Sequence, residues 1–384
     1  MVKRKRIALN YRFSYEFSAG IVIYIQNVIK GFALLEDQYK PHLTIIYSKD
    51  SPINEVKEIG YPYIEYYKYQ PLRKNFFTKV INKLSREFLR TNLFKRYSFP
   101  TECDILYPYF DSDETFYYRN RYYWKPDFQE MYYPQYIEQK EYDFVVQNMK
   151  KIASNQNYTL VFSSKDSYTD FEKFFGPYRN EVKTLRFISI LPQIEKLNPD
   201  QVLRKYAINK RYFMVSNQFW PHKNHHLVLE AINNLKEEFK DFTVVFSGKQ
   251  SSYRDREYFS KLQVYINNHN LKEFVRFIGF IPREEQLVIM KRSVAVIQPS
   301  LFEGWSTVIE DCKALNQFVL AGDLAVNQEQ IKENCLFFKR HSVQDLTKNM
   351  RKLLTTTPTI VPKKYTDNIE QFKKDLVQVF TLDV

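Results

Sequence analysis

The sequence predicts an α/β protein made of two successive domains, each built on a parallel sheet. The chain has 384 residues, more than one hydrophobic core usually supports. Strand-like and helix-like segments alternate along it, which favours parallel strands joined by crossover helices. A Pro-containing joint at residues 191–199 separates two such alternating runs. We therefore expect domains at residues 1–190 and 191–360, with a C-terminal helix, 361–384, able to cross back to the first domain.

The first domain begins with a βαβ pattern. In order, the apolar spacing predicts a strand at residues 6–11, a helix at 20–36, a strand at 42–48, a helix at 141–156, and strands at 158–164 and 182–189. Residues 101–145 are crowded with aromatic residues and proline and have weak periodicity. We expect strands and loops facing a cleft in that region.

The second domain repeats the alternation. The pattern predicts strands at 211–217, 243–248, 275–280 and 294–300, and helices at 224–239, 256–270, 283–293 and 307–315. Each strand is followed by a helix, so the carboxyl ends of the strands gather at one edge of the sheet. Ligands of open α/β sheets bind at that edge.

Composition limits the class of protein. A net charge of +13 favours anionic partners such as phosphates, nucleic acid or an acidic membrane surface. The 30 Tyr and 32 Phe suit sugar stacking, membrane-interface contact and RNA equally well. Cys103, Cys312 and Cys335 have no disulfide or zinc spacing, and neither a secretory signal nor a membrane-spanning run is present. We expect a cytoplasmic protein.

Residues 300–316, SLFEGWSTVIEDCKALN, place acids on both sides of a helix start. The free N–H groups of a first helical turn form a site for phosphate. Thr307 and Glu310 match a capping box with Thr307 as N-cap. Asp311 lies one turn below Thr307, where it can accept hydrogen bonds from a ribose, and Glu303 can bind a second ring. The alternative is a capped surface helix with solvated acids.

The segment PSLFEGWSTVIEDCKALNQFVLAGD resembles the donor-site motif of retaining glycosyltransferases of family 4, which have the GT-B fold. In that motif two acids separated by seven residues flank a Gly-rich turn, and here they are Glu303 and Asp311. The resemblance implies two Rossmann-like domains facing a central cleft. It also implies that Glu303 binds the donor sugar, that Asp311 binds the ribose, and that the turn holds the diphosphate through Gly304, Trp305, Ser306 and Thr307. Asp stands where Glu is usual, so Glu310 is an alternative ribose ligand.

A second segment, VSNQFWPHKNHHLVLEAI, resembles the part of the family that neutralises the diphosphate with an Arg and a Lys. Lys223 fits the Lys, whereas Asn217 or a neighbour occupies the Arg position. Leaving-group stabilisation would then depend on Lys223 and helix dipoles. The spacing of His222, His225 and His226 suits no common metal site, and we expect them to pack or cap. The loop that begins at Gly279 resembles the one that borders the nucleotide base.

The first half resembles the family less closely. Ala19 and Gly20 match a loop and helix that approach the donor phosphates, with an ordinary βα turn as the alternative. In WKPDFQEMYYP, Asp127 is the candidate for contacting the donor sugar, with a capped turn as the alternative. Asp111 to Asp113 resemble the metal-binding acids of the GT-A fold, but the βαβ order argues against that fold. We expect neither a metal nor a cofactor.

Residues 75–96 form a basic amphipathic stretch. One face of the predicted helix carries Phe77, Val80, Ile81, Leu84 and Phe88, and the other carries Lys79, Lys83, Arg86 and Arg90. Such a helix can lie in an anionic membrane surface. Alternatively, its apolar face packs in the domain core and its basic face is solvated.

Together these features predict a glycosyltransferase that moves a sugar from a UDP- or GDP-sugar to a glycan or lipid-linked acceptor with retention of configuration. We expect it to act in surface polysaccharide or glycolipid synthesis at the inner face of the membrane, with Glu303, Lys223 and Asp127 at the reaction centre. One alternative is a basic aromatic RNA-binding protein, but no RRM strand pattern is present and we expect no nucleic acid. Another is a different GT-B enzyme, an inverting transferase or a phosphorylase.

Overall fold

The computed structural model describes residues 4–70, 75–89, 93–94, 100, 102–109, 120–251 and 255–382. The chain forms two compact units. Unit 1 contains residues 1–126, 143–188 and 366–384, and unit 2 contains residues 127–142 and 189–365. Asp111 to Asp113, the acids that resemble a GT-A metal site, lie outside the described residues.

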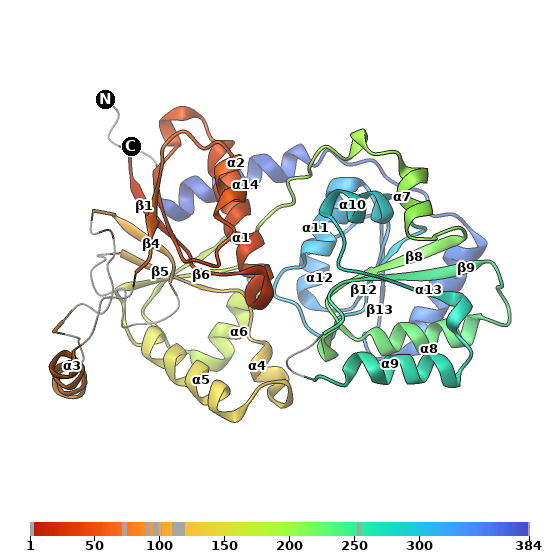
Figure 1. Ribbon diagram of the computed structural model, residues 1–384, viewed down its shortest axis with the longest axis horizontal. Helices are drawn as coiled ribbons and strands as arrows, with labels where there is room; N and C mark the ends of the chain where they lie inside the picture. Colours follow the sequence, from red (N-terminus) through yellow and green to blue (C-terminus); the bar gives the residue numbers. More distant parts are fainter. Residues whose placement is uncertain are drawn as a thin grey trace. The chain divides into compact units, whose positions relative to one another are not determined.

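Unit 1 is built on a seven-stranded parallel sheet with the order β3-β2-β1-β4-β5-β6-β7 (Figure 1). Its strands are β1 (Arg6–Tyr11), β2 (His42–Tyr47), β3 (Ile64–Lys68), β4 (Ile105–Tyr109), β5 (Asn120–Lys125), β6 (Tyr158–Phe162) and β7 (Glu181–Thr184). β1 lies between β2 and β4 and is buried from Ile7 to Tyr11, as a strand covered on both faces must be. The predicted parallel sheet is confirmed for this unit.

Helices precede or follow the strands of unit 1 along the chain. They are α1 (Tyr15–Ala33), α2 (Ile53–Glu58), α3 (Phe76–Leu89), α5 (Gln139–Ala153), whose first four residues group with unit 2, α6 (Lys165–Phe175) and α14 (Thr366–Phe380). The C-terminal helix α14 lies against α1, where the rings of Phe32 and Phe380 meet edge to face at 5.2 Å. The end of the chain therefore completes the hydrophobic core of unit 1.

Gly31 makes the close contact between α1 and α14. A Cβ atom added there would lie 2.4 Å from Phe372 Cε1 and 2.6 Å from Leu376 Cδ1. Gly31→Val is therefore expected to lower the free energy of unfolding by about 1–3 kcal/mol through overpacking, seen as a lower melting temperature. Gly20→Val is the matched control, because Gly20 lies in the same helix and an added Cβ there meets nothing within 4 Å. Equal melting temperatures for the two variants would contradict this packing.

Unit 2 contains a six-stranded parallel sheet with the order β10-β9-β8-β11-β12-β13. Its strands are β8 (Arg211–Ser216), β9 (Phe242–Ser247), β10 (Val275–Gly279), β11 (Val296–Gln298), β12 (Val319–Gly322) and β13 (Cys335–Phe338). Its helices are α4 (Gln129–Tyr132), α7 (Pro199–Lys205), α8 (His225–Leu235), α9 (Tyr258–Asn268), α10 (Arg283–Arg292), α11 (Thr307–Leu315), α12 (Ala325–Gln330) and α13 (Val343–Thr355). α8, α9 and α13 lie on one face of the sheet, and α7, α10 and α11 lie on the other (Figure 1). Leucines and valines of each group of helices fill the core on that face.

The loops after β8, β9 and β11 meet at one edge of the unit 2 sheet. Gly248 follows β9 with a φ of 144°, and an added Cβ would lie 2.1 Å from the carbonyl oxygen of Asn217. Only glycine allows this approach of two backbones. The close packing places the loop after β8, which carries Asn217 and Lys223, at the edge where β11 also ends.

Candidate functional site

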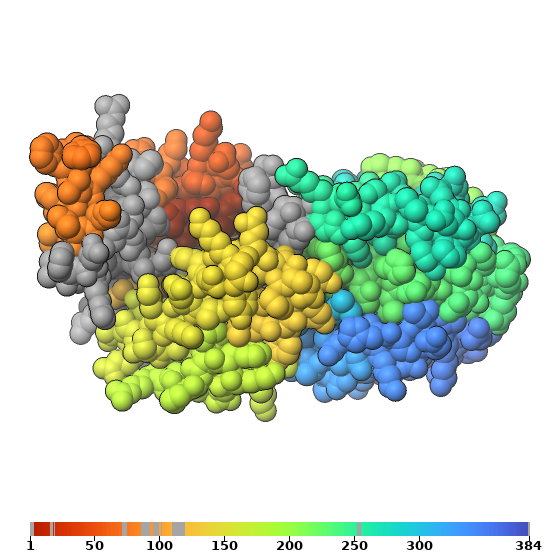
Figure 2. Space-filling model, turned by 90° about the horizontal axis from the view of Figure 1, so that it is seen from below, coloured from red at the N-terminus to blue at the C-terminus, as the bar shows by residue number. Residues whose placement is uncertain are grey.

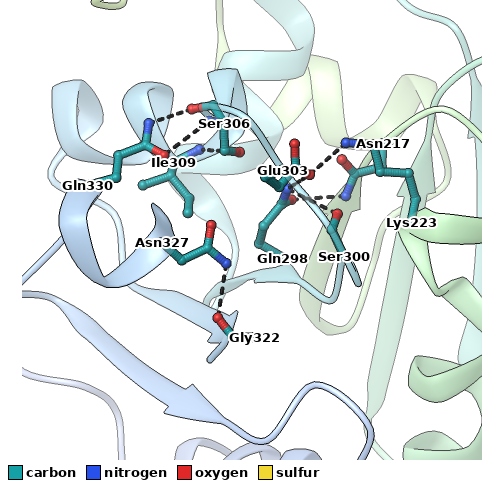
Figure 3. A network of polar contacts seen from close by, with 10 residues as sticks. All are labelled: Asn217, Lys223, Gln298, Ser300, Glu303, Ser306, Ile309, Gly322, Asn327 and Gln330. Carbon is teal, nitrogen blue, oxygen red and sulfur yellow. Dashed lines mark hydrogen bonds and ion pairs between the residues drawn. The ribbon is translucent and has the colours of Figure 1, made fainter. Parts of the chain in front are cut away.

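The loop after β11 leads into the N-terminus of α11, which a serine caps. Ser306 has an extended backbone with φ −87° and ψ 119°, and its Oγ accepts a hydrogen bond from Ile309 N at 3.3 Å. Gln330, at the end of α12, holds the same residue from the other side. It accepts from Ser306 N at 3.0 Å and donates to Ser306 O at 2.7 Å (Figure 3). These contacts fix the turn before a helix end whose N–H groups can bind an anion.

The predicted capping box is wrong by one residue. The N-cap is Ser306, so Thr307 is the first residue of α11 and Glu310 lies beyond the position that reaches back to the cap. The carboxylate of Glu310 instead accepts bonds from Lys313 at 2.7 Å, from Gln330 at 3.0 Å and from Tyr365 at 2.5 Å. The reason for the difference is that adjacent serine and threonine can both cap, and the backbone conformation at Ser306 decides between them.

Glu303 lies three residues before the cap, in an ion pair with Lys223. Lys223 Nζ is 2.6 Å from Glu303 Oε1, and the two side chains are only 16% and 9% exposed. Gln298 at the end of β11 donates from Nε2 to the same oxygen at 2.6 Å. Both contacts converge on Oε1, so the carboxylate has a fixed orientation and its Oε2 takes part in neither contact.

Asn217 holds Gln298 in place through a hydrogen bond. Its Nδ2 donates to Gln298 Oε1 at 3.0 Å, and both side chains are buried (Figure 3). The four side chains form one chain of contacts, from Asn217 through Gln298 to Glu303 and Lys223. Asn217 thus orients Gln298, and Gln298 in turn orients Glu303.

Lys223 reaches Glu303 because a short 3-10 turn, Pro221–Lys223, precedes α8. The turn ends at Asn224 in the left-handed conformation, with a φ of 54°. His225 follows and stacks on Phe219 with ring centroids 4.3 Å apart, and burial lowers its pKa to about 3. A neutral histidine packed on an aromatic ring is a core residue. Among the described residues, no group of three or more His, Cys, Asp or Glu side chains could hold a metal ion.

Asp311 is 2% exposed and bonded to two residues. Its Oδ1 accepts from Ser189 Oγ at 2.5 Å and pairs with the guanidinium of Arg283, which opens α10. Its neighbour Glu310 is 1% exposed. Two adjacent buried carboxylates are stable only because each has a cation and further donors.

The other predicted site residues are distributed over both units. Gly304 is buried and Trp305 half-buried in the turn before α11, with Lys313 Nζ 5.9 Å from the Trp305 ring. Gly279 ends β10 with a φ of 72°. Gly20 lies within α1 of unit 1.

Asp127 caps a turn locally, accepting from Gln129 N at 3.0 Å. The segment that carries it groups with unit 2, where the rings of Tyr132 and Phe302 lie 5.4 Å apart. The segment therefore reaches the residue that precedes Glu303.

Sequence reasoning missed Gln298, Gln330 and Tyr365. Gln298 had a usable signal, because it is the polar residue within the apolar strand segment VAVIQPS. A polar side chain in such a strand is buried and needs partners. Gln330 and Tyr365 had no local signal, since their partners lie 24 and 55 residues away.

Part of the chain is similar to a known family and to one characterised protein. Residues 200–374 match the family described as "Glycosyl transferases group 1". The O-antigen chain mannosyltransferase RfbU of Salmonella typhimurium is 25% identical over 235 residues, which cover 59% of this chain and 60% of that protein. The aligned part thus spans less than two thirds of this relative.

Solved structures agree over nearly the whole chain. Anabaena Alr3699/HepE in complex with UDP and glucose superposes with a TM-score of 0.66 at 14% identity, covering 98% of this chain and 95% of that one. WaaG, a glycosyltransferase involved in lipopolysaccharide biosynthesis, gives a TM-score of 0.62 at 12% identity with the same coverage. The predicted GT-B fold is confirmed. The chain has the GT-B fold, and its residues 200–374 match the glycosyl transferases group 1 family.

Proposed function

We propose that the protein is a retaining glycosyltransferase of family 4 that transfers a sugar from a UDP- or GDP-sugar to a glycan or lipid-linked acceptor. The observation that carries this proposal is the buried ion pair between Lys223 and Glu303. Gln298 donates to Glu303, and Glu303 lies three residues before the N-cap of α11. A cation, a carboxylate and a helix N-terminus close together suit a ligand with both a diphosphate and sugar hydroxyls.

Each group has a role in this proposal. The ammonium of Lys223 has three donors, so it can keep Glu303 and also bind the diphosphate. The N–H groups of the first turn of α11 bind the same phosphates. Glu303 accepts from a hydroxyl of the donor sugar, and Asp311 from the ribose. Asp127, whose segment reaches Phe302, is the candidate for a further contact with the donor sugar.

Transfer then proceeds without an acid/base pair from the protein. The bond between the anomeric carbon and the β-phosphate oxygen breaks, an acceptor oxygen bonds to the same face of the sugar, and its proton passes to the departing diphosphate. Positioning and stabilisation of the leaving charge supply the catalysis. The names of the relatives support a sugar nucleotide donor and a surface polysaccharide product: RfbU is an O-antigen chain mannosyltransferase, and HepE was solved with UDP and glucose.

The anomeric configuration of the product tests the mechanism. The proton NMR coupling constant of the transferred sugar should match the donor anomer. Inverted product would contradict retention and favour the inverting alternative. Release of a sugar phosphate when inorganic phosphate replaces the acceptor would favour a phosphorylase.

We also propose that α3 binds the anionic surface of a membrane. Figure 2 shows α3, in orange, at the surface. The apolar side chains of α3 that the structure describes are exposed, with Phe76 at 75%, Phe77 at 74% and Leu84 at 49%. Among the side chains of α3 that the structure describes, the buried ones are polar, and Asn82 bonds both backbone groups of Phe94 at 2.8 Å. The alternative in which the apolar face packs in the core does not hold for Phe77, Val80, Ile81 and Leu84, which are exposed.

Charge agrees with this surface, because Lys79 and Lys83 are also exposed on α3. The side chains of residues 86–90 lie outside those that the structure describes. In the described ranges, no helix has the length and apolar character needed to cross a bilayer. Interfacial binding through one helix face needs no such span.

Vesicle co-sedimentation tests α3. The wild-type protein is expected to sediment with vesicles containing anionic lipid at low salt, and Phe76→Ser with Phe77→Ser to weaken binding about tenfold or more, because two exposed rings leave the interface. Phe144→Ser is the control, since Phe144 on α5 is an exposed ring outside α3, 55% exposed. Absence of wild-type binding, or equal losses in both variants, would contradict the proposal.

A further inference from the structure

The first and last residues of the long segment of unit 2 lie next to each other. The segment runs from Ser189 to Tyr365, and its first and last residues are bonded: Ser189 N donates to Tyr365 Oη at 2.8 Å. Each of them is the residue at which the chain passes to or from unit 1. The two crossings are therefore fastened to each other within unit 2.

Both residues also bond α11 at two adjacent acids. Tyr365 Oη donates to Glu310 Oε2 at 2.5 Å, and Ser189 Oγ donates to Asp311 Oδ1 at 2.5 Å. Burial and the neighbouring Glu310 raise the pKa of Tyr365 well above its usual value, so the phenol stays protonated and donates. Both acids are buried, so each hydrogen bond limits the orientation of its carboxylate.

The segment before Tyr365 is attached along its length. Asn334 accepts from Val361 N at 2.8 Å and donates to Val361 O at 2.9 Å. Asn316 accepts from Lys363 N at 2.7 Å and donates to Lys363 O at 3.0 Å. Alternate residues 361, 363 and 365 thus make the anchoring contacts, as in an extended strand.

This attachment reaches both ends of α11. Asn316 is the C-cap of the helix, in the left-handed conformation, whereas Glu310 lies in its first turns. The segment 361–365 therefore holds α11 at its C-cap, Asn316, and at Glu310, the fourth residue of the helix. The helix whose N-terminus we assign to the diphosphate has no freedom to rotate without breaking these bonds.

We propose that Ser189 and Tyr365 are positioning residues for the nucleotide: they orient Asp311 and Glu310 so that the ribose hydroxyls and the diphosphate are bound by one rigid helix. This inference rests on the proposed function. Neither residue needs to touch the donor, because each acts through a carboxylate. A carboxylate that is already oriented loses less conformational freedom on binding, which strengthens the complex.

The test is calorimetric titration of the full-length protein with UDP and GDP, and with the 2′-deoxy analogue of whichever binds. Wild-type protein should bind the ribonucleotide about tenfold more tightly than the analogue, as expected for one hydrogen bond to a charged group. Tyr365→Phe and Ser189→Ala should weaken ribonucleotide binding roughly five- to tenfold, and should bring the ribose preference close to one.

Tyr212→Phe is the matched control. Tyr212 is a buried tyrosine of β8 in the same unit, and its Oη donates to Ile289 O at 2.8 Å. If Tyr365→Phe and Ser189→Ala lower the melting temperature as the control does yet retain both the affinity and the ribose preference, the residues are only structural and the inference is overturned. Ser189→Ala decides the question if Tyr365→Phe does not fold. If wild-type protein binds no nucleotide, the proposed function itself fails, and the inference with it.

Discussion

Glu303→Gln is expected to lower kcat for sugar transfer by about 10²–10³-fold. Glutamine has the shape of glutamate but not its charge. Its amide would also face two donors, Lys223 Nζ and Gln298 Nε2, both 2.6 Å from the present carboxylate oxygen. The amide oxygen can accept from both donors, but an amide NH2 group then replaces Oε2, so the variant loses the charge and the acceptor for the sugar hydroxyl. Initial rates at saturating donor measure the effect.

Glu285→Gln is the control for this substitution. Glu285 is a second glutamate of unit 2 in an ion pair, 2.8 Å from Lys205 Nζ, and it also accepts from Tyr206. It lies on α10 and not in the loop after β11. Its replacement should leave kcat within about twofold, because exposed ion pairs contribute little. If Glu303→Gln is as active as Glu285→Gln, Glu303 has no role in transfer.

Lys223→Met is expected to reduce kcat/KM by about 10²–10³-fold, mainly through kcat. The substitution keeps the length of the side chain but removes the cation from the departing diphosphate. It also leaves the carboxylate of Glu303, which is 9% exposed, without its cation. Steady-state kinetics with varied donor concentration separate the two parameters.

Two further variants separate the roles of Lys223. Lys205→Met breaks the other ion pair and should be nearly neutral, since Lys205 is 55% exposed. The double variant Lys223→Met with Glu303→Gln removes both charges, so no buried carboxylate is left unpaired. If Lys223 only neutralises Glu303, the double variant should be no slower than Glu303→Gln alone. If it also binds the diphosphate, as we propose, the double variant should be slower.

The spacing of apolar residues was enough to locate helices and strands that contain long apolar runs. The strand predicted at residues 6–11 and the helix predicted at 307–315 match β1 and α11 residue for residue. The helix predicted at 20–36 begins earlier, at Tyr15, because Tyr15 and Phe17 are the only large apolar residues between Ser14 and Gly20 and give no helical repeat. Propensity and spacing fail at such ends, where tertiary contacts decide.

Short strands and polar helices were not predicted. β12 and β13 have four residues each, too few for a period to appear. α6 was missed because most of its residues are polar; its sequence is KDSYTDFEKFF. Ser164 caps this helix by accepting from Ser167 N. The aromatic region 101–145 contains β4 and β5, whose alternation is hidden because almost every residue is large and buried.

The site was predictable only in part, for a physical reason. Glu303 and Lys223 lie in segments whose spacing carries chemistry, so a motif reveals them. Gln298 and Tyr365 act through hydrogen bonds between elements far apart in the chain, and no single segment records such contacts. The N-cap at Ser306 depended on a backbone angle and not on residue type. The sequence therefore does not reveal the hydrogen bonds that hold the site residues in place.

The most direct test of the account is nucleotide release from a panel of UDP-, GDP-, ADP- and dTDP-sugars, measured by mass spectrometry for wild-type protein and Glu303→Gln. We expect wild-type protein to release one nucleotide, from a UDP- or GDP-sugar, and Glu303→Gln to release about 10²–10³-fold less. Release that is equal in the two proteins would contradict the role of Glu303. No release from any donor, together with no thermal stabilisation by any nucleotide, would contradict the proposed glycosyltransferase.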